Sequence, residues 1–391
     1  MRFILICLQI ILCTVNSFAY GISIVNMSNK GWVLLDNSNT PFIIKGVCYS
    51  PIPIGKIPYN FNMFNDENKP WLQDGDLMDS MGVNTIRIYT SGSDPDSCKK
   101  FIRQMYKLYS INTVFPLPLD MHGVDFASQE ELDKAKEKIL DMVREYKDTP
   151  GILLWLVGNE IDYYFYDNRS NWETEEIEKL PSPYKRAIGR AEIIFQFVNN
   201  VIKEIHQIDD MHPVGISLGK TEFFNSIEDN LPHADFIGLN YYQARNFSSV
   251  WSFTKRIKMP ILITEFGYDA YNTKKKEEDE KGQAKFIESM WKDIFKNTFY
   301  QNPHGICLGG MVFEWTDEWW KYDYGHPNEH DVTGTWPNAA WLDFTADEPN
   351  NVQEEWFGIF KVVRSKTNKI DTRKPRLIYD RLKKMWNNKV Y

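Results

Sequence analysis

Several features that define particular protein classes are absent from this sequence. Among 391 residues, 45 Lys and Arg stand against 53 Asp and Glu, a net charge of −8, so the basic excess typical of a nucleic-acid-binding surface is missing. Beyond the N-terminus no run approaches the roughly 18 apolar residues of a membrane span. Residues 383–391 are basic and polar, unlike the hydrophobic tail of a lipid-anchor signal. We therefore expect neither a nucleic-acid partner nor a membrane span.

Motifs for cofactor and metal chemistry are also lacking. The sequence contains no Gly-rich phosphate loop and no nucleophile-elbow serine. His326 and His330 are four residues apart, but Gly325 and Pro327 disfavour a helical pair of metal ligands. We expect no cofactor and no metal site.

The N-terminus has the layout of a secretory signal peptide. Arg2 precedes an apolar run at 3–15, and residues suitable for cleavage follow at 17–19. We expect residues 1–19 to be removed and the protein to be extracellular. Residues 20–391 are then expected to form one catalytic domain.

Secretion permits disulfide bonds and N-linked glycans. Removal of the leader leaves Cys48, Cys98 and Cys307. Cys48 and Cys98 follow the first and second predicted strands, where a bridge between them is geometrically plausible, and Cys307 is expected to be buried and unpaired. Three Asn-x-Ser triplets are candidate glycan sites: Asn26, Asn168 and Asn246.

Apolar runs alternate with longer amphipathic stretches along the chain. The runs predict eight strands, at 42–47, 84–89, 113–117, 152–157, 213–217, 236–239, 261–264 and 306–313. The amphipathic stretches predict helices at 72–81, 97–109, 128–146, 183–207, 221–229, 248–258, 282–299 and 376–386. Eight such repeats favour an α/β fold, a single (β/α)8 TIM barrel, over a doubly wound sheet. Long loops follow strand 4 (161–181) and strand 8 (315–355), and loops after barrel strands line the active face.

Two glutamates directly follow predicted strands at this face. Glu160 follows the strand at 152–157, and Glu265 follows the strand at 261–264. Two carboxyl groups that face each other across a cleft can cleave a glycosidic bond, one as general acid and the other as nucleophile or base. Asn328-Glu329 and Thr221-Glu222-Phe223 repeat the same local sequences, but neither follows a buried strand.

Four further residues are candidates for substrate binding. Arg87 lies in the second strand, where its guanidinium would favour the ionised form of a neighbouring carboxylate, or serve as a structural ion pair. Asn159 could bond a sugar 2-hydroxyl. Tyr241, after the sixth strand, could donate to the nucleophile, and Trp315, after the eighth, could form the floor of the sugar site. Each aromatic residue could equally be packing.

These motifs resemble a known clan of enzymes. Asn159-Glu160 after the fourth strand and a Glu after the seventh are similar to the retaining glycoside hydrolases with (β/α)8 catalytic domains. The segments 82–89, 94–98, 157–160 and 264–267 resemble the fungal β-1,3-glucanosyltransferases, which usually carry another Cys before the second strand and often a lipid anchor. The closing segments 356–360 and 372–375 are more like the barrel domains of β-galactosidases and β-glucuronidases.

The resemblance implies a secreted retaining β-glycosidase or transglycosylase that acts by double displacement, with β-1,3-glucan favoured as its polysaccharide or oligosaccharide substrate. Glu265 would attack the anomeric carbon, and Glu160 would donate and then accept a proton. One alternative is a β-mannanase, β-galactosidase or β-glucuronidase-like hydrolase of the same mechanism. Another is a catalytically inactive carbohydrate-binding barrel. The oligomeric state is left open.

An excess of aromatic residues accords with a sugar substrate. Aromatic residues make up 15% of the chain and include 13 Trp, within an ordinary globular composition. Flat aromatic rings stack on the apolar C–H faces of sugars with little loss of entropy. Seven tryptophans in the two long loops and the segment after them are predicted to line such a cleft: Trp172, Trp315, Trp319, Trp320, Trp336, Trp341 and Trp356.

Overall fold

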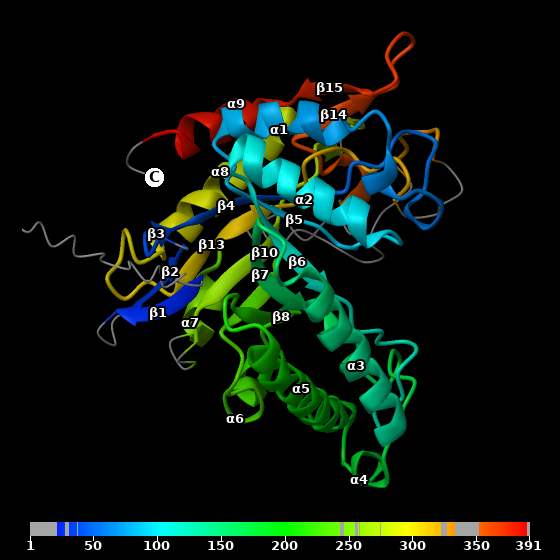
Figure 1. Cartoon of the computed structure of the whole chain (residues 1–391), viewed down its shortest axis with the longest axis vertical. Coiled ribbons are helices and arrows are strands. Elements are labelled where there is room, and N and C mark those ends of the chain that lie inside the picture. Colours follow the sequence, from blue (N-terminus) through cyan, green and yellow to red (C-terminus); the bar gives the residue numbers. More distant parts are fainter. Residues whose placement is uncertain are drawn as a thin grey trace, which may run out of the picture.

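The predicted apolar runs form eight parallel strands that close into one barrel (Figure 1). The computed structural model describes residues 22–27, 31–36, 38–242, 246–254, 257, 259–273, 275–321, 327–332 and 352–388. The barrel strands are β4 (Ile44–Cys48), β5 (Thr85–Arg87), β6 (Asn112–Leu117), β7 (Ile152–Val157), β8 (Val214–Leu218), β9 (Phe236–Asn240), β10 (Ile261–Phe266) and β13 (Cys307–Val312). Consecutive barrel strands pair in parallel, and β13 pairs with β4 to close the ring. The predicted (β/α)8 barrel is confirmed.

Burial on both faces explains why these strands read as continuous apolar runs. Every residue of β7, β8, β9, β10 and β13 is buried. Side chains on one face fill the barrel, and those on the other contact the surrounding helices, so neither face needs polar residues.

Helices follow the barrel strands and cover the outside of the barrel. They are α1 (Pro70–Met81), α2 (Pro95–Tyr109), α3 (Gln129–Tyr146), α4 (Glu175–Glu178), α5 (Pro183–Ile208), α6 (Ile227–Asn230), α7 (Ser248–Thr254), α8 (Glu280–Lys296) and α9 (Leu377–Trp386). Local sequence starts several of them. Asp94, Ser128 and Ser182 each accept a hydrogen bond from a backbone N–H of the first turn, which is the usual N-cap arrangement.

The chain has elaborations that periodicity did not predict. Short antiparallel sheets are formed by β1 (Ser23–Met27), β2 (Gly31–Leu35) and β3 (Pro41–Phe42), by β11 (Tyr271–Asn272) and β12 (Glu277–Glu278), and by β14 (Phe360–Val363) and β15 (Thr372–Pro375). Single turns of 3-10 helix occur at Pro58–Asn60, Met63–Asn65, Ile161–Phe165, Phe224–Ser226 and Glu354–Trp356. Helices α3 and α5 pack side by side and extend away from the barrel toward α4 (Figure 1).

The two long loops differ in how much of them is described. The loop at 161–181 begins with the 3-10 helix Ile161–Phe165 and includes α4. Of the segment 315–355, the structure describes 315–321, 327–332 and 352–355, so Trp336, Trp341 and His326 lie outside the described residues. The predicted signal peptide at 1–19 also lies outside them.

The three cysteines among the described residues are unpaired, which corrects the expected bridge between Cys48 and Cys98. Cys48, Cys98 and Cys307 are all free and buried. The Cys48 thiol lies inside the barrel, 3.6 Å from the carbonyl oxygen of Thr264 on β10. Cys98 lies on α2, outside the barrel wall, where burial raises the pKa of its thiol to about 12. The two thiols therefore lie on different sides of the barrel wall, which accords with their unpaired state.

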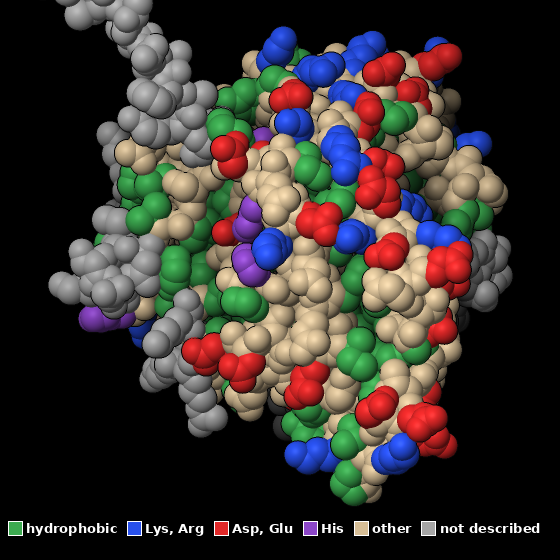
Figure 2. Space-filling model, turned by 60° about the horizontal axis from the view of Figure 1, so that its bottom comes forward, with side chains coloured by type: hydrophobic (Ala, Val, Ile, Leu, Met, Phe, Trp, Pro, Cys, Tyr) green, Lys and Arg blue, Asp and Glu red, His purple; other side chains and the backbone are tan. Residues whose placement is uncertain are grey.

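The described surface accords with the charge balance of the sequence. On the face drawn in Figure 2, basic and acidic side chains lie intermingled, without a continuous basic patch. No helix in the described part of the chain is long and apolar enough to cross a membrane.

A buried arginine attaches the C-terminal segment to the barrel. The guanidinium of Arg376 donates to both carboxylate oxygens of Asp317, at 2.6 and 2.7 Å, and to the carbonyl oxygen of Gly358 at 2.7 Å. Its Nε donates to Glu278 at 2.7 Å. Asp317 follows β13 and Glu278 lies in β12, so one side chain joins segments distant in sequence.

We predict that Arg376→Ala destabilises the fold strongly. The substitution leaves the buried Asp317 carboxylate without its partner, which typically costs about 3–5 kcal/mol of unfolding free energy. The control is Arg381→Ala, because the Arg381 side chain pairs with Glu288 but is 43% exposed, and exposed pairs contribute about 1 kcal/mol or less. Urea denaturation measures both losses. Equal losses in the two variants would contradict the prediction.

Candidate active site

Glu265 lies at the end of β10, where three donors hold its side chain. Its Oε1 accepts from the guanidinium of Arg87 at 2.9 Å and from the hydroxyl of Tyr89 at 2.7 Å. Its Oε2 accepts from the hydroxyl of Tyr242 at 2.6 Å. The side chain is almost fully buried, and these bonds compensate its charge and fix its orientation.

Arg87 connects Glu265 with other strand ends. Its Nη2 donates to Asn159 Oδ1 at 2.6 Å, and its Nη1 also donates to Asn240 Oδ1 at 3.0 Å. Burial acts to lower the pKa of Arg87, but Tyr89 and Glu265 outweigh it, and the net pKa is raised. Arg87 is thus a permanent cation that orients three polar side chains at once.

Glu160 lies beside this network in a different environment. Its Oε1 accepts from Asn240 Nδ2 at 3.1 Å, and the same nitrogen donates to Asn159 Oδ1 at 3.1 Å. Burial, and then the negative charge of Glu265, raise the pKa of Glu160 to about 8. A carboxyl group with this pKa is largely protonated at neutral pH and can donate a proton.

The backbone at Glu160 is itself unusual. Its φ is +50°, a left-handed conformation that non-glycine residues adopt infrequently. The preceding Gly158 has a φ of +65°. Such conformations concentrate at functional sites, where surrounding contacts hold them in place. The turn directs the chain from the end of β7 into the 3-10 helix Ile161–Phe165.

The structure brings four of the predicted site residues into one network: Glu160, Glu265, Arg87 and Asn159. Sequence reasoning missed Tyr89, Asn240 and Tyr242. Tyr89 is two residues after Arg87, so strand alternation, which puts such residues on one face, could have identified it. Asn240 is the last residue of β9, a position equivalent to those that drew attention to the glutamates.

The prediction for Tyr241 needs a correction. Its hydroxyl is hydrogen-bonded to Ser249 Oγ at 2.8 Å, and its ring packs against Phe247. The hydroxyl that donates to the carboxylate of Glu265 from this loop is that of the next residue, Tyr242. Sequence position identified the loop, but which of two adjacent tyrosines turns inward depends on the backbone after β9.

The prediction for Trp315 is also corrected. Trp315 is 0% exposed and packs against Phe360, so its ring is part of the core and offers no face to a sugar. Phe313 takes the place near the carboxylates instead. Its ring makes edge contacts with Tyr89 and Tyr242, the two tyrosines bonded to Glu265, at centroid distances of 6.5 and 6.0 Å.

Most of the other loop tryptophans that the structure describes also serve packing. Trp172 is buried against Phe126, and Trp356 stacks on the ring of His330. Trp319 also stacks with the ring of His330. Trp172, Trp315 and Trp356 therefore pack the loops, which corrects the expectation for these three rings. Trp319 and Trp320 are half-buried, and their place in the cleft stays a prediction.

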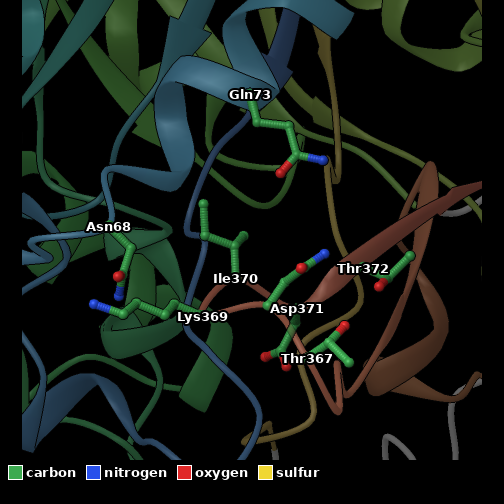
Figure 3. Close-up of a pocket in the computed structure, with 8 residues that line it drawn as sticks. Asn68, Gln73, Thr367, Lys369, Ile370, Asp371 and Thr372 are labelled. Carbon is green, nitrogen blue, oxygen red and sulfur yellow. The ribbon is translucent and has the colours of Figure 1, made fainter.

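A cavity of about 240 Å³ lies beside Arg87 and Tyr89, at the ends of β5, β6 and β7. Its other polar lining residues include Asn159, Asp120 and Tyr164. A larger depression of about 480 Å³ lies between the N-terminal part of α1 and the β14–β15 hairpin (Figure 3). The carboxylate of Asp371 in this depression accepts a hydrogen bond from the backbone N–H of Ile54. None of the lining residues is among the hydrogen-bond partners of Glu160 or Glu265. Of these two cavities, the smaller borders the hydrogen-bond network of the carboxylates, through Arg87, Tyr89 and Asn159.

No group of three or more His, Cys, Asp or Glu side chains suited to a metal ion occurs among the described residues. The polar groups that the structure gathers at the site are two carboxyl groups and their hydrogen-bond donors. A protonated carboxyl group and an anchored carboxylate at one barrel mouth can cleave a glycosidic bond.

Comparison with known families supports the same chemistry. Residues 15–340 match the family described as glucanosyltransferase, Glyco_hydro_72. The chain belongs to this family. The match ends before β14, so the hairpin β14–β15 and α9 follow the matched region.

A curated relative aligns with most of this chain. The 1,3-beta-glucanosyltransferase gel2 of Aspergillus fumigatus is 24% identical over 331 residues, which cover 80% of this chain and 62% of gel2. The chain thus spans less than two thirds of the length of this relative.

Solved structures share the fold at low sequence identity. A β-glucuronidase of Bacteroides uniformis aligns with a TM-score of 0.60 and 15% identity over 94% of this chain and 37% of its own. Gas2p of Saccharomyces cerevisiae, solved with laminaritetraose and laminaripentaose, aligns with a TM-score of 0.53 and 16% identity over 94% and 67% of the two chains.

We predict that the two adjacent tyrosines differ sharply in their effect on turnover. Tyr242→Phe removes a hydrogen bond to a charged group, which is worth about 1.5–3 kcal/mol, and should lower kcat/KM on β-1,3-gluco-oligosaccharides by about 10- to 100-fold. Tyr241→Phe removes a bond to Ser249 and should change kcat/KM by less than about 3-fold, since neutral bonds contribute about 1 kcal/mol or less. Steady-state kinetics decide, and the opposite ranking would refute the assignment.

Proposed function

We propose that this chain is a secreted enzyme that cleaves β-1,3-glucan and transfers the released glycosyl group to an acceptor, with retention of configuration. The observation that carries the proposal is the contrast between the two carboxyl groups. Glu160 has a pKa raised to about 8 by burial and by Glu265, whereas three donors hold Glu265 as an oriented nucleophile. A retaining glycosidase needs this division of roles.

The first half of the reaction breaks the glycosidic bond. A carboxylate oxygen of Glu265 attacks the anomeric carbon and forms an ester to the enzyme. Glu160 transfers its proton to the glycosidic oxygen, which leaves with the electron pair of the broken bond. Arg87, Tyr89 and Tyr242 position the attacking carboxylate, and Asn240 contacts the acid, so both groups approach the bond in fixed orientation.

The second half regenerates the enzyme. Glu160, now a carboxylate, removes a proton from the incoming hydroxyl, whose oxygen attacks the anomeric carbon and displaces Glu265. A sugar acceptor gives transfer, and water gives hydrolysis. Two inversions at one carbon restore the original configuration. Family membership supports transfer as the main outcome.

Three further features support the remaining parts of the proposal. The similarity to gel2 and to a laminarin-oligosaccharide complex of Gas2p favours a β-1,3-linked glucan. The leader-like sequence at 1–19 supports secretion and one domain at 20–391. Asn168 and Asn246 are exposed, as acceptors for N-linked glycans must be.

The same carboxyl pair would also serve a β-glucuronidase-like hydrolase. The higher TM-score to a β-glucuronidase is the observation that favours this alternative. A panel of β-1,3-glucan, β-mannan, β-galactoside and β-glucuronide substrates separates the two. Binding without turnover on the whole panel would instead indicate a carbohydrate-binding barrel.

We predict that Glu265→Gln and Glu160→Gln abolish or strongly reduce product formation from laminari-oligosaccharides. Loss of the acid alone should lower the rate by about 10²- to 10⁴-fold. Glu222→Gln is the matched control, because Thr221-Glu222-Phe223 repeats the local sequence around Glu265 but its side chain is 40% exposed. Chromatography of the products measures all three. Full activity in either of the first two variants would end the assignment, and products longer than the substrate would establish transfer.

We predict that activity is lost as the pH rises through about 8. The pKa of Glu160 is raised to about 8, so the acid is protonated below that pH and ionised above it. The first step needs the protonated form, and kcat/KM should therefore fall tenfold per pH unit on the basic side. A pH profile on an oligosaccharide with a poor leaving group checks this. A basic limb near pH 5 would contradict the raised pKa of Glu160.

A further inference from the structure

A second buried carboxylate lies next to the acid/base without taking part in the network around Arg87. Asp162 is two residues after Glu160, on the 3-10 helix Ile161–Phe165, and its side chain is fully buried. Its Oδ1 accepts a hydrogen bond from the backbone N–H of Gly219 at 2.8 Å. Gly219 directly follows β8, the strand that pairs with β7. Asp162 therefore connects the segment that carries Glu160 to the end of the neighbouring strand.

The contact between these two segments is close as well as polar. A Cβ atom placed on Gly219 would lie 2.3 Å from the ring of Tyr163, so only glycine allows this ring to pack here. The N–H of Tyr163 also donates to the carbonyl oxygen of Glu160 at 3.2 Å. Two adjacent residues of the first turn after Glu160, Asp162 and Tyr163, thus contact Gly219 in the loop after β8.

This attachment explains how Glu160 keeps its backbone conformation. A φ of +50° at a glutamate is unfavourable by about 1–3 kcal/mol and persists only where neighbouring contacts hold it. Asn240 donates to the side chain of Glu160, and the N–H of Tyr163 donates to its carbonyl oxygen. Asp162 is the polar side chain that fixes the backbone immediately after the turn.

Charge adds a second effect of Asp162 on the acid. The groups that act on Glu160 are Glu265 and Asp162, which raise its pKa, and Asn240 and Arg87, which lower it. Burial raises the pKa of Asp162 to about 7, against the N–H groups of Gly219 and Lys220 and the charge of Lys220. Asp162 is then mostly an anion at the pH where Glu160 titrates.

The surroundings of Lys220 are also charged and aromatic. Its ammonium group lies over the rings of Tyr163 and Tyr166 and 3.8 Å from Glu222. Arg169 contributes a further positive charge near Lys220 and Tyr163. The positive charge of Lys220 is therefore shared among Tyr163, Tyr166, Glu222 and Asp162, and it does not act on Asp162 exclusively.

We propose that Asp162 is a positioning residue for the acid/base: its carboxylate holds the segment after Glu160 against the β8 loop and places a buried negative charge two residues after Glu160. The proposal rests on the function proposed above. Asp162 touches no reacting atom, and the second carboxylate oxygen, which is buried and has no hydrogen-bond partner among the described residues, leaves its negative charge poorly compensated.

Two substitutions separate the two effects. Asp162→Asn keeps an oxygen that can accept from Gly219 but removes the charge, so Glu160 should titrate lower and the basic limb of kcat/KM should move by about one pH unit to lower pH. Asp162→Ala also removes the attachment, and kcat at the pH optimum should fall a further 10- to 100-fold, as for misplaced catalytic groups. If Asp162→Ala does not fold, Asp162→Ser, whose hydroxyl is too short to make the same bond, replaces it.

The control is Asp209→Asn. Asp209 is also a buried aspartate and accepts from Trp155 Nε1 at 2.7 Å, but it precedes β8, at the opposite end of that strand from Gly219. Its substitution should leave the basic limb in place. Thermal unfolding of every variant shows whether a loss of kcat follows a loss of folded protein.

The outcomes are distinct from failure of the proposed function. If the wild-type protein forms no products from any glycoside, the proposed function fails. If the wild type is active but the limb of Asp162→Asn coincides with that of Asp209→Asn, the electrostatic role is overturned. If Asp162→Ala has the same kcat as Asp162→Asn, the positioning role is overturned.

Discussion

The ion pair between Arg87 and Glu265 determines how the mouth of the barrel is built. Burying two charges is unfavourable unless their remaining hydrogen-bonding capacity is satisfied. Here Tyr89 and Tyr242 donate further hydrogen bonds to the carboxylate of Glu265. Asn159 and Asn240 accept further hydrogen bonds from the guanidinium of Arg87. The pair and its partners come from four strands, β5, β7, β9 and β10, or the loops directly after them, so the complete network forms only when the barrel has closed. Fold and site are consequently coupled through one buried pair.

Two carboxyl groups at the same end of the barrel differ in how many hydrogen-bond donors surround them. Glu265 accepts hydrogen bonds from three donors, whereas the side chain of Glu160 accepts one from a single amide, that of Asn240, among the described residues. Because Glu160 is desolvated without matching donors and lies near the charge of Glu265, its pKa rises. The division of roles that we propose between acid and nucleophile therefore follows from the number of donors that each side chain contacts.

Several tryptophans of the long loops are buried in packing, although the affinity of tryptophan for sugar faces predicts them in the cleft. Tryptophan does favour sugar faces, but a chain with long loops over a barrel must also bury those loops. Trp315, Trp356 and Trp172 contribute to that second task. The stacked rings of Trp319, His330 and Trp356 and the buried pair of Arg376 with Asp317 attach the loops after β13 to the barrel. Phe313, a smaller ring that sequence reasoning did not select, contacts the tyrosines of the site.

The sequence by itself determined the eight-strand barrel and the two glutamates, because both depend on local patterns. Buried parallel strands are continuous apolar runs, and the residue after such a run must lie at the barrel mouth. The choice of Tyr242 over Tyr241, the burial of Trp315 and the free state of Cys48 and Cys98 were decided only by the tertiary structure. Each of these depends on which way a side chain points at a strand end or on which side of the barrel wall it lies. Asn240 and Asp162 act through contacts with neighbouring strands, and such contacts exist only once the barrel is closed.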